Sequence, residues 1–235
     1  RSLALAEKRN DIQGIADACN CVATAYFSVK DYANALTYFR KAMNNYSRLG
    51  LKGRSKSEGV IACIGFIYES QGDYNHALEY YNRSLEMARS SGDKKAIAIA
   101  IGNIGNVYSM QGDDARAMDC YLKSLSLKQQ AGDNEGVAKS ASNLGRLYKN
   151  QGDYTKSLQY YQTAYDAAIE NDDKYMQAAT LINIGNIYRE EGELKTSINY
   201  HYRALKLADA LHSKPLKSSA NSAIGLVYWS MANYS

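Results

Sequence analysis

The chain repeats one stretch, Asn103-Ile104-Gly105-Asn106-Val107-Tyr108, followed three residues later by the turn Gln111-Gly112-Asp113. The same pattern returns around Gly145 and again around Gly185, so the three glycines are 40 residues apart. A fixed period of this length is typical of proteins built from stacked structural repeats. The spacing therefore predicts a repeat architecture.

Weaker copies carry the same register through the rest of the chain. Gly65 and Gly225 take the place of Gly105, and Ala23 takes it in the first copy. A tyrosine follows three residues later in every copy, at Tyr26, Tyr68, Tyr108, Tyr148, Tyr188 and Tyr228. Only the interval from Ala23 to Gly65 differs, at 42 residues. We expect the two extra residues to lie in a Gly/Ser/Lys-rich turn, 51–57.

Each repeat predicts two antiparallel helices. In the first, apolar residues such as Ile97, Ile101 and Ile104 recur every three or four positions. Gly112 ends that helix because glycine accepts the left-handed conformation, and Asp113 caps the next helix. The expected first helices are 12–29, 55–71, 94–111, 134–151, 174–191 and 214–231. The expected second helices are 31–49, 73–91, 113–131, 153–171 and 193–211.

Small residues on facing helices, such as Gly105 and Ala117, predict a close approach of the two backbones. A leucine at Gly145 should wedge such a pair apart, whereas a leucine at Lys128 should be tolerated. We expect one array over residues 1–235, with about five full repeats and partial repeats at both ends. In this interpretation 232–234 forms the turn before a further helix, and the chain is part of a longer protein.

Composition narrows the function classes. A net charge of +4 is too mild for a polybasic nucleic-acid binder. The longest apolar stretch, 96–101, is too short to span a bilayer. The four cysteines form no C-x-x-C pair, and we expect all four to be reduced thiols packed in the interior.

The sequence contains no recognisable catalytic or metal-binding set. The three histidines, His76, His201 and His212, lack metal-ligand spacing. His201 replaces the aromatic found at Tyr121 and Tyr161, so we expect a packing histidine with its polar atoms satisfied. No Gly-rich phosphate loop and no nucleophile–base pair is apparent. We therefore expect neither enzymatic activity nor a cofactor.

The repeated residues resemble the tetratricopeptide repeat family. The matching positions are Ile101, Ile104-Gly105, Tyr108, Ala117, Tyr121 and Ser124. The chain departs from the family pattern in its 40-residue period and in having Gly-Asp where a proline is usual. This longer form resembles Pins-type polarity adaptors, kinesin light chains and bacterial regulators. The resemblance implies an all-α fold, a right-handed superhelix of stacked antiparallel helix pairs that serves as a protein- or peptide-binding scaffold.

In such a solenoid the first helices line a concave groove. The stripe of first-helix residues that points into this groove is therefore the candidate partner-binding site. Asparagine can bond a peptide backbone as donor and acceptor, and arginine can hold a carboxylate with two bonds. The stripe therefore predicts a partner with an acidic segment, although some asparagines could instead tie neighbouring repeats together. The candidates are Asn103, Asn106, Lys139, Asn143, Arg146, Lys149, Asn183, Asn186 and Arg189.

Apolar residues at the two ends of the stripe are candidate anchors for a bound peptide. They are Phe66, Leu226 and Trp229, and the alternative is core exposed at the end of an array.

The resemblance leaves two regulatory roles open. One is a sensing or recruiting module for a protein partner. The other is a nucleic-acid-associated regulator whose array controls an attached DNA-binding or kinase domain. The carboxylate clamp of heat-shock chaperone adaptors is not matched. Its three cations would fall on Gly102, Ala179 and Asn183, and only its two asparagines are kept, as Asn106 and Asn143.

Overall fold

A computed structural model describes residues 2–233, and over that range the chain forms α-helices joined by short turns, with one 3-10 helix and no β-strand. None of the described helices is long and apolar enough to cross a membrane. The helices, in chain order, are α1 (Ser2–Lys8), α2 (Ile12–Ser28), α3 (Tyr32–Arg48), η1 (Gly50–Gly53), α4 (Arg54–Ser70), α5 (Tyr74–Ser91), α6 (Lys94–Met110), α7 (Asp114–Gln130), α8 (Asn134–Asn150), α9 (Tyr154–Glu170), α10 (Lys174–Glu190), α11 (Leu194–Ala210) and α12 (Lys214–Asn233).

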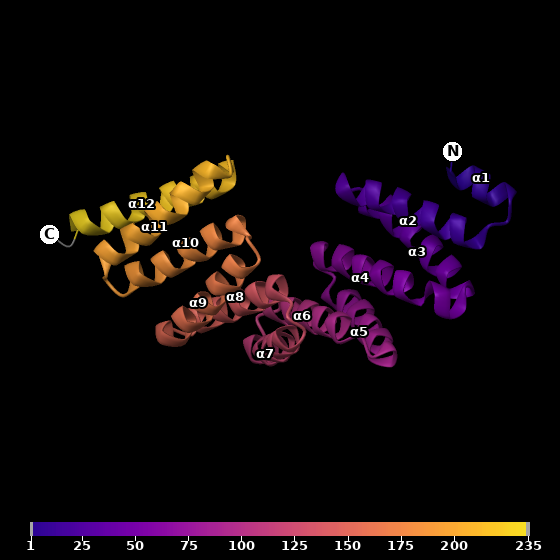
Figure 1. The fold of residues 1–235 in the computed structure, drawn as a ribbon, viewed down its shortest axis with the longest axis horizontal. Helices are drawn as coiled ribbons and strands as arrows, with labels where there is room; N and C mark the ends of the chain where they lie inside the picture. Colours follow the sequence, from indigo (N-terminus) through magenta and orange to yellow (C-terminus); the bar gives the residue numbers. More distant parts are fainter. Residues whose placement is uncertain (1, 234–235) are drawn as a thin grey trace. The chain divides into compact units, whose positions relative to one another are not determined.

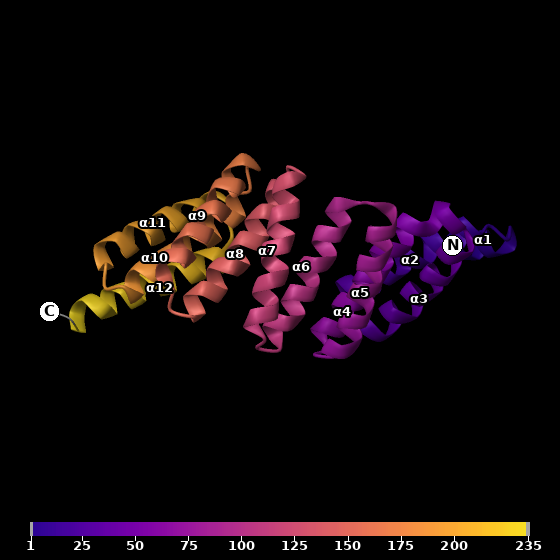
Figure 2. The same cartoon turned by 90° about the horizontal axis from the view of Figure 1, so that it is seen from below.

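The helices pack as the repeat predicts. Helix α2 packs on α3 and α4 packs on α5, and α8 and α10 pair in the same way with α9 and α11 (Figure 1). Figure 2 shows α10 and α11 side by side along their length. The expected all-α solenoid of helix pairs is confirmed, and most helix ends fall within one or two residues of their expected positions.

The helices divide into two compact units. Unit 1 runs from Arg1 to Cys120 and unit 2 from Tyr121 to Ser235, so the division falls within α7. A single continuous array over the whole chain stays a prediction.

The turns between first and second helices share one design. Gly72, Gly112 and Gly152 adopt positive φ angles of 76–77°. An aspartate follows and caps the next helix; Asp153, for example, accepts the backbone N–H of Lys156 at 3.0 Å. The first copy has Lys30 at φ 61° instead, a conformation that a side chain disfavours.

The end of α12 differs from the expectation. Helix α12 continues through Ala232 and Asn233, where the sequence predicts a turn. Ala232 takes the place of the glycine that follows α4, α6, α8 and α10, and alanine favours the helical conformation. Tyr234, the last residue of the expected turn, lies outside the described residues.

A glycine on each of three first helices lies directly against an aromatic ring of the second helix. A Cβ added at Gly65 or Gly145 would lie 2.8 Å from the ring of Tyr81 or Tyr161, closer than packed carbons come. In the latter pair Ser157 also donates its hydroxyl to the Gly145 carbonyl at 2.6 Å. The backbones therefore approach too closely for any larger residue.

Lys128 is not the tolerant surface position that the sequence analysis assumes. It is 7% exposed, and its Nζ donates to Ser140 Oγ at 3.0 Å. Burial lowers the pKa of its ammonium group. The equivalent residues Ala88 and Ala168 are small and fully buried, so this register faces the helix interface in every repeat. A lysine at one copy does not move the position to the surface.

The glycine contact gives a direct stability test. Gly145→Leu should lower the free energy of unfolding by about 3 kcal/mol, because the added side chain must displace the Tyr161 ring. Lys206→Leu, at an exposed position on α11, should change it by no more than about 0.5 kcal/mol. Urea titrations followed by circular dichroism measure both, and equal midpoints would contradict the packing described here.

Candidate functional site

The first-helix face comprises the predicted stripe of polar and charged residues on α6, α8 and α10. In unit 1 it contributes Asn103 and Asn106, both half-buried on α6. In unit 2 it contributes Lys139, Asn143, Arg146 and Lys149 on α8 and Asn183, Asn186 and Arg189 on α10. Arg146 and Lys139 are exposed and the other five are half-buried. Each candidate thus keeps some contact with solvent.

Unit 1 carries a buried acid at the equivalent position of α4, which the sequence analysis missed. Glu69 on α4 occupies the register of Lys149 and Arg189, four residues after the repeat glycine, yet it is only 8% exposed. The hydroxyl of Tyr81 donates to its carboxylate at 2.7 Å. Burial raises the pKa of Glu69, while the Tyr81 hydrogen bond opposes the rise. This acid makes unit 1 unlike unit 2 at the same position.

In unit 2 the structure brings two of the predicted cations together around Glu190. Lys149 Nζ lies 3.1 Å from Glu190 Oε1, and Arg189 approaches the same oxygen at 3.7 Å. The three side chains are only 27–29% exposed. The nearby Glu190 charge also raises the pKa of the Tyr154 hydroxyl. Helices α8 and α10, which come from successive repeats, thus build one cluster around a carboxylate.

Other members of the face lie apart from this cluster. Lys139 pairs with Glu135, one turn earlier on α8, at 2.5 Å, and both side chains are more than half exposed. Such a solvated pair contributes little stability. Arg146 lies on α8 one turn before Lys149, and its charge lowers the pKa of Tyr161, opposing the larger upward shift that burial causes.

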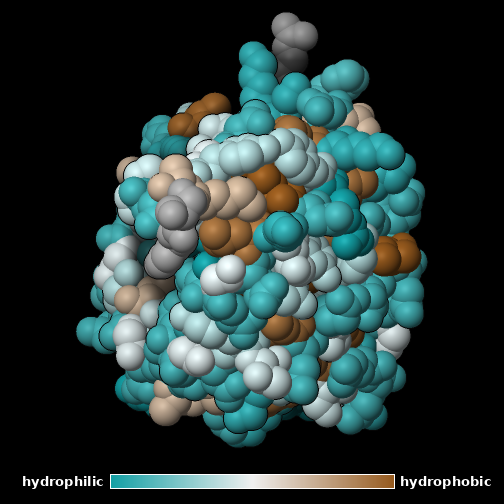
Figure 3. All heavy atoms as spheres, turned by 90° about the vertical axis from the view of Figure 1, so that its left-hand side faces the viewer, coloured by the Kyte–Doolittle hydropathy of each residue, from teal (hydrophilic) through white to brown (hydrophobic). Residues whose placement is uncertain are grey.

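The predicted apolar anchors are all accessible. Phe66 on α4 is 44% exposed, and its ring meets that of Phe27 edge-on at 5.5 Å. Leu226 and Trp229 on α12 are 48% and 68% exposed. On the face drawn in Figure 3, apolar groups form separate patches among hydrophilic ones. No large continuous apolar surface is visible there.

His201 packs as predicted, but its ring is not hydrogen-bonded. It is fully buried against Gly185, and both of its ring nitrogens lack a hydrogen-bond partner within residues 2–233. Burial, together with the nearby Arg189 charge, lowers the pKa of His201 to about 4. The expectation of a satisfied histidine is therefore wrong, because no polar group of the surrounding helices reaches the ring.

The cysteines also differ in part from the expectation. Cys19 is buried and Cys63 and Cys120 are half-buried, but Cys21 is exposed. Residues two apart on a helix point in different directions, so Cys19 and Cys21 cannot both face the core. No group of three or more His, Cys, Asp or Glu among the described residues is placed to hold a metal ion.

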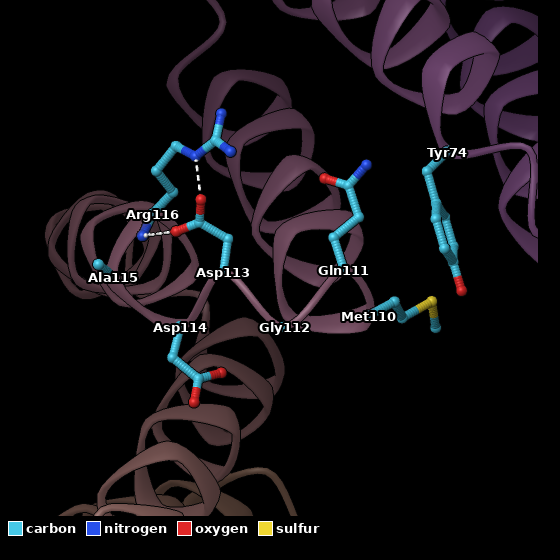
Figure 4. Close-up of a pocket in the computed structure, with 8 residues that line it drawn as sticks. All are labelled: Tyr74, Met110, Gln111, Gly112, Asp113, Asp114, Ala115 and Arg116. Atoms are coloured by element: carbon cyan, nitrogen blue, oxygen red, sulfur yellow. Dashed lines mark hydrogen bonds and ion pairs between the residues drawn. The ribbon is translucent and has the colours of Figure 1, made fainter.

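A broad hollow of about 880 Å³ lies at the turn between α6 and α7 in unit 1. Figure 4 shows Tyr74 on one side of it and the turn residues on the other. Asp113 accepts both the backbone N–H and the side-chain Nε of Arg116. These bonds lower the pKa of Asp113. The arginine is thus already neutralised by its own turn, and the hollow offers no unpaired cation to a ligand.

Antiparallel helix pairs with a 40-residue period define a helical repeat solenoid. The tetratricopeptide repeat model matches residues 57–130, 116–170 and 136–210, and a second model of the same description matches residues 15–48. The chain belongs to the tetratricopeptide repeat family. No curated protein sequence matches it.

Several solved structures share the fold. BtubC (BKLC) from P. vanneervenii is 20% identical with a TM-score of 0.76, and the match covers 91% of this chain and 89% of that chain. Aspartyl phosphate phosphatase F from Bacillus subtilis is 12% identical with a TM-score of 0.83, covering 96% and 59%. The Rap conjugation gene regulator of plasmid pLS20, solved with the Phr* peptide, is 15% identical with a TM-score of 0.73, covering 92% and 59%. At these identities the likeness shows the fold alone.

The buried histidine predicts an acid-sensitive stability. Its pKa is about 4 in the folded state against about 6.5 in the unfolded chain, so the unfolded chain binds the proton more tightly. The contribution of the neutral His201 ring to the free energy of unfolding is therefore fully present above pH 6.5 and is lost as the pH drops toward 4. His201→Phe, which copies Phe39 of the first repeat, should remove about 2 kcal/mol of this loss at pH 4.5.

Urea titrations at pH 7.5 and pH 4.5 measure this difference. His212→Asn, at an exposed turn position, serves as the control and should keep the full pH dependence. A His201→Phe variant that loses as much stability as the parent chain on acidification would show that the ring is already protonated when folded.

Proposed function

We propose that the chain is a protein-interaction scaffold that binds an acidic segment of a partner on the first-helix face of unit 2. The observation that carries this proposal is the cluster of Lys149, Arg189 and Glu190. One carboxylate of the chain is held there between two cations from different helices. Lys149 and Arg189 are therefore already positioned to bind a carboxylate, and a carboxylate of the partner would bind to the same two cations.

Arg146 extends the cluster outward. It is exposed and follows Asn143 and precedes Lys149 on one side of α8, at the three-residue spacing that aligns side chains on a helix. Asn183 and Asn186 repeat this alignment on α10. Amide side chains can bond a peptide backbone of any sequence, so the cations would select acidic residues while the amides hold the chain.

Family membership supports the scaffold role, since extended repeat surfaces are suited to binding other chains. The Rap conjugation gene regulator of plasmid pLS20 was solved in complex with the Phr* peptide. By analogy with it, we propose that this chain serves as the sensing or recruiting module of a regulatory protein. The proposal assigns the chain no catalytic step.

The exposed arginine provides the main test. A synthetic peptide of alternating Glu and Ala is titrated calorimetrically into the parent chain and into Arg146→Glu. The variant should bind at least about tenfold more weakly, because a cation is replaced by a repelling charge. Lys206→Glu, an equal charge change on exposed α11, should bind like the parent, and a peptide of alternating Lys and Ala should not bind.

Equal affinity of Arg146→Glu and the parent chain would refute this surface as the site. A titration with nucleic acid in place of the peptide tests the alternative of nucleic-acid binding, whose affinity would fall steeply with salt. Substituting a short single-stranded DNA for the peptide should give no binding at physiological salt.

Removing the charge of Glu190 should have the opposite effect on peptide affinity. Its carboxylate competes with a bound acidic side chain for Lys149 and Arg189. Glu190→Gln should therefore tighten binding of the Glu-Ala peptide severalfold, with no loss of helicity. The exposed Glu193→Gln removes the same charge beyond the end of α10 and should change the affinity less. Weaker binding by Glu190→Gln would show that Glu190 positions the cations and does not compete.

A further inference from the structure

A second cavity, of about 380 Å³, lies in unit 1 at the place where the repeat departs from its 40-residue period. Its volume falls in the range of roughly 300–1,000 Å³ that is usual for small-molecule sites. The walls come from the end of α3, from η1 and from α4 and α5. The lining residues that matter are Tyr46, Leu51, Arg54, Ser57, Arg83 and Met87.

Two sequence features open this cavity. The extra residues form η1 after Gly50, whose φ of 58° turns the chain away from α3. Ser57 stands in the register that Ile97 and Val137 fill in α6 and α8. A small polar residue thus replaces a branched apolar one where the chain is also lengthened.

The cavity contains one buried polar group that the chain itself leaves unused. Ser57 is 5% exposed and lines the cavity, and no residue between 2 and 233 bonds its hydroxyl. Helix α4 follows directly on η1 and has no side-chain cap, and the N–H of Arg54 donates to the Leu51 carbonyl. The unbonded hydroxyl of Ser57 can donate to an acceptor such as a carboxylate oxygen.

The charges at the rim favour the same ligand. Arg83 on α5 is exposed, and within the described range no carboxylate pairs with it. Arg54 on α4 donates to the hydroxyl of Ser90. Tyr46 offers only its ring, because its hydroxyl already donates to Asp17 at 2.6 Å. Leu51, 84% exposed, and Met87 complete an apolar wall beside the two arginines.

We propose that this cavity is a binding site for a small organic acid that has one carboxylate and an apolar body. The carboxylate lies between Arg54, Arg83 and the Ser57 hydroxyl, and the apolar part covers Leu51 and Met87. The site lies in unit 1, and the proposal does not rest on the proposed function of unit 2.

Calorimetric titration with octanoate tests the site. The parent chain should bind octanoate but neither octanol nor octylammonium, which lack the negative charge. Arg83→Gln should weaken binding at least about tenfold. Arg89→Gln, an exposed arginine on the same helix, is the matched control and should bind like the parent.

Ser57→Ile tests the cavity itself, because it introduces the branched apolar residue type that α6 and α8 carry at this position. Ser57→Ile should lose octanoate binding while keeping the circular dichroism spectrum of the parent. The proposal is overturned if octanoate binds to Arg83→Gln and Ser57→Ile as tightly as to the parent chain. It is equally overturned if the parent chain binds no octanoate at millimolar concentration, or binds octanol equally well.

Discussion

The contact between a glycine on one helix and an aromatic ring on the next holds three of the helix pairs together, α4–α5, α8–α9 and α10–α11. Gly145 against Tyr161 and Gly65 against Tyr81 leave no room for a Cβ, so the backbones lie at the minimum distance that the ring allows. Because interiors are packed to crystal density, this distance also sets where the rest of both helices meet. In these pairs, the residues of the first-helix face, the cluster around Glu190 and the walls of the cavity are positioned by this packing.

Much of this arrangement follows from local rules in the sequence. Glycine and aspartate mark nearly every helix end, and apolar spacing marks the buried sides, so helix bounds could be predicted closely. Lys128 could not be placed, because lysine is a surface residue on average and only the alanines of the other copies indicate its burial. The pairing of Lys149 with Glu190 joins two repeats, and a one-dimensional pattern does not show which neighbours meet. The unbonded ring of His201 depends likewise on what the surrounding helices do not offer.

The repeats keep their packing residues while changing the charge on their exposed side. The position four residues after the repeat glycine is Glu69, Ser109, Lys149 or Arg189 in successive copies. The glycine contact is present at Gly65, Gly145 and Gly185, whereas the residue four positions later changes from a buried acid to a cation. Binding chemistry therefore varies independently of fold, which is why the fold alone does not name a partner.

The pair α10–α11 differs from its neighbours in one respect, since the ring that holds it together can take up a proton. In stacked repeats each pair contacts only adjacent pairs, so stability is a sum of local contributions, and one pair can open without the rest. Protonation of His201 lowers the free energy of opening for α10 and α11, whereas the tyrosine of α9 is insensitive to acid. As the pH falls, the backbone amides of α10 and α11 therefore lose their protection from hydrogen exchange before those of α8 and α9.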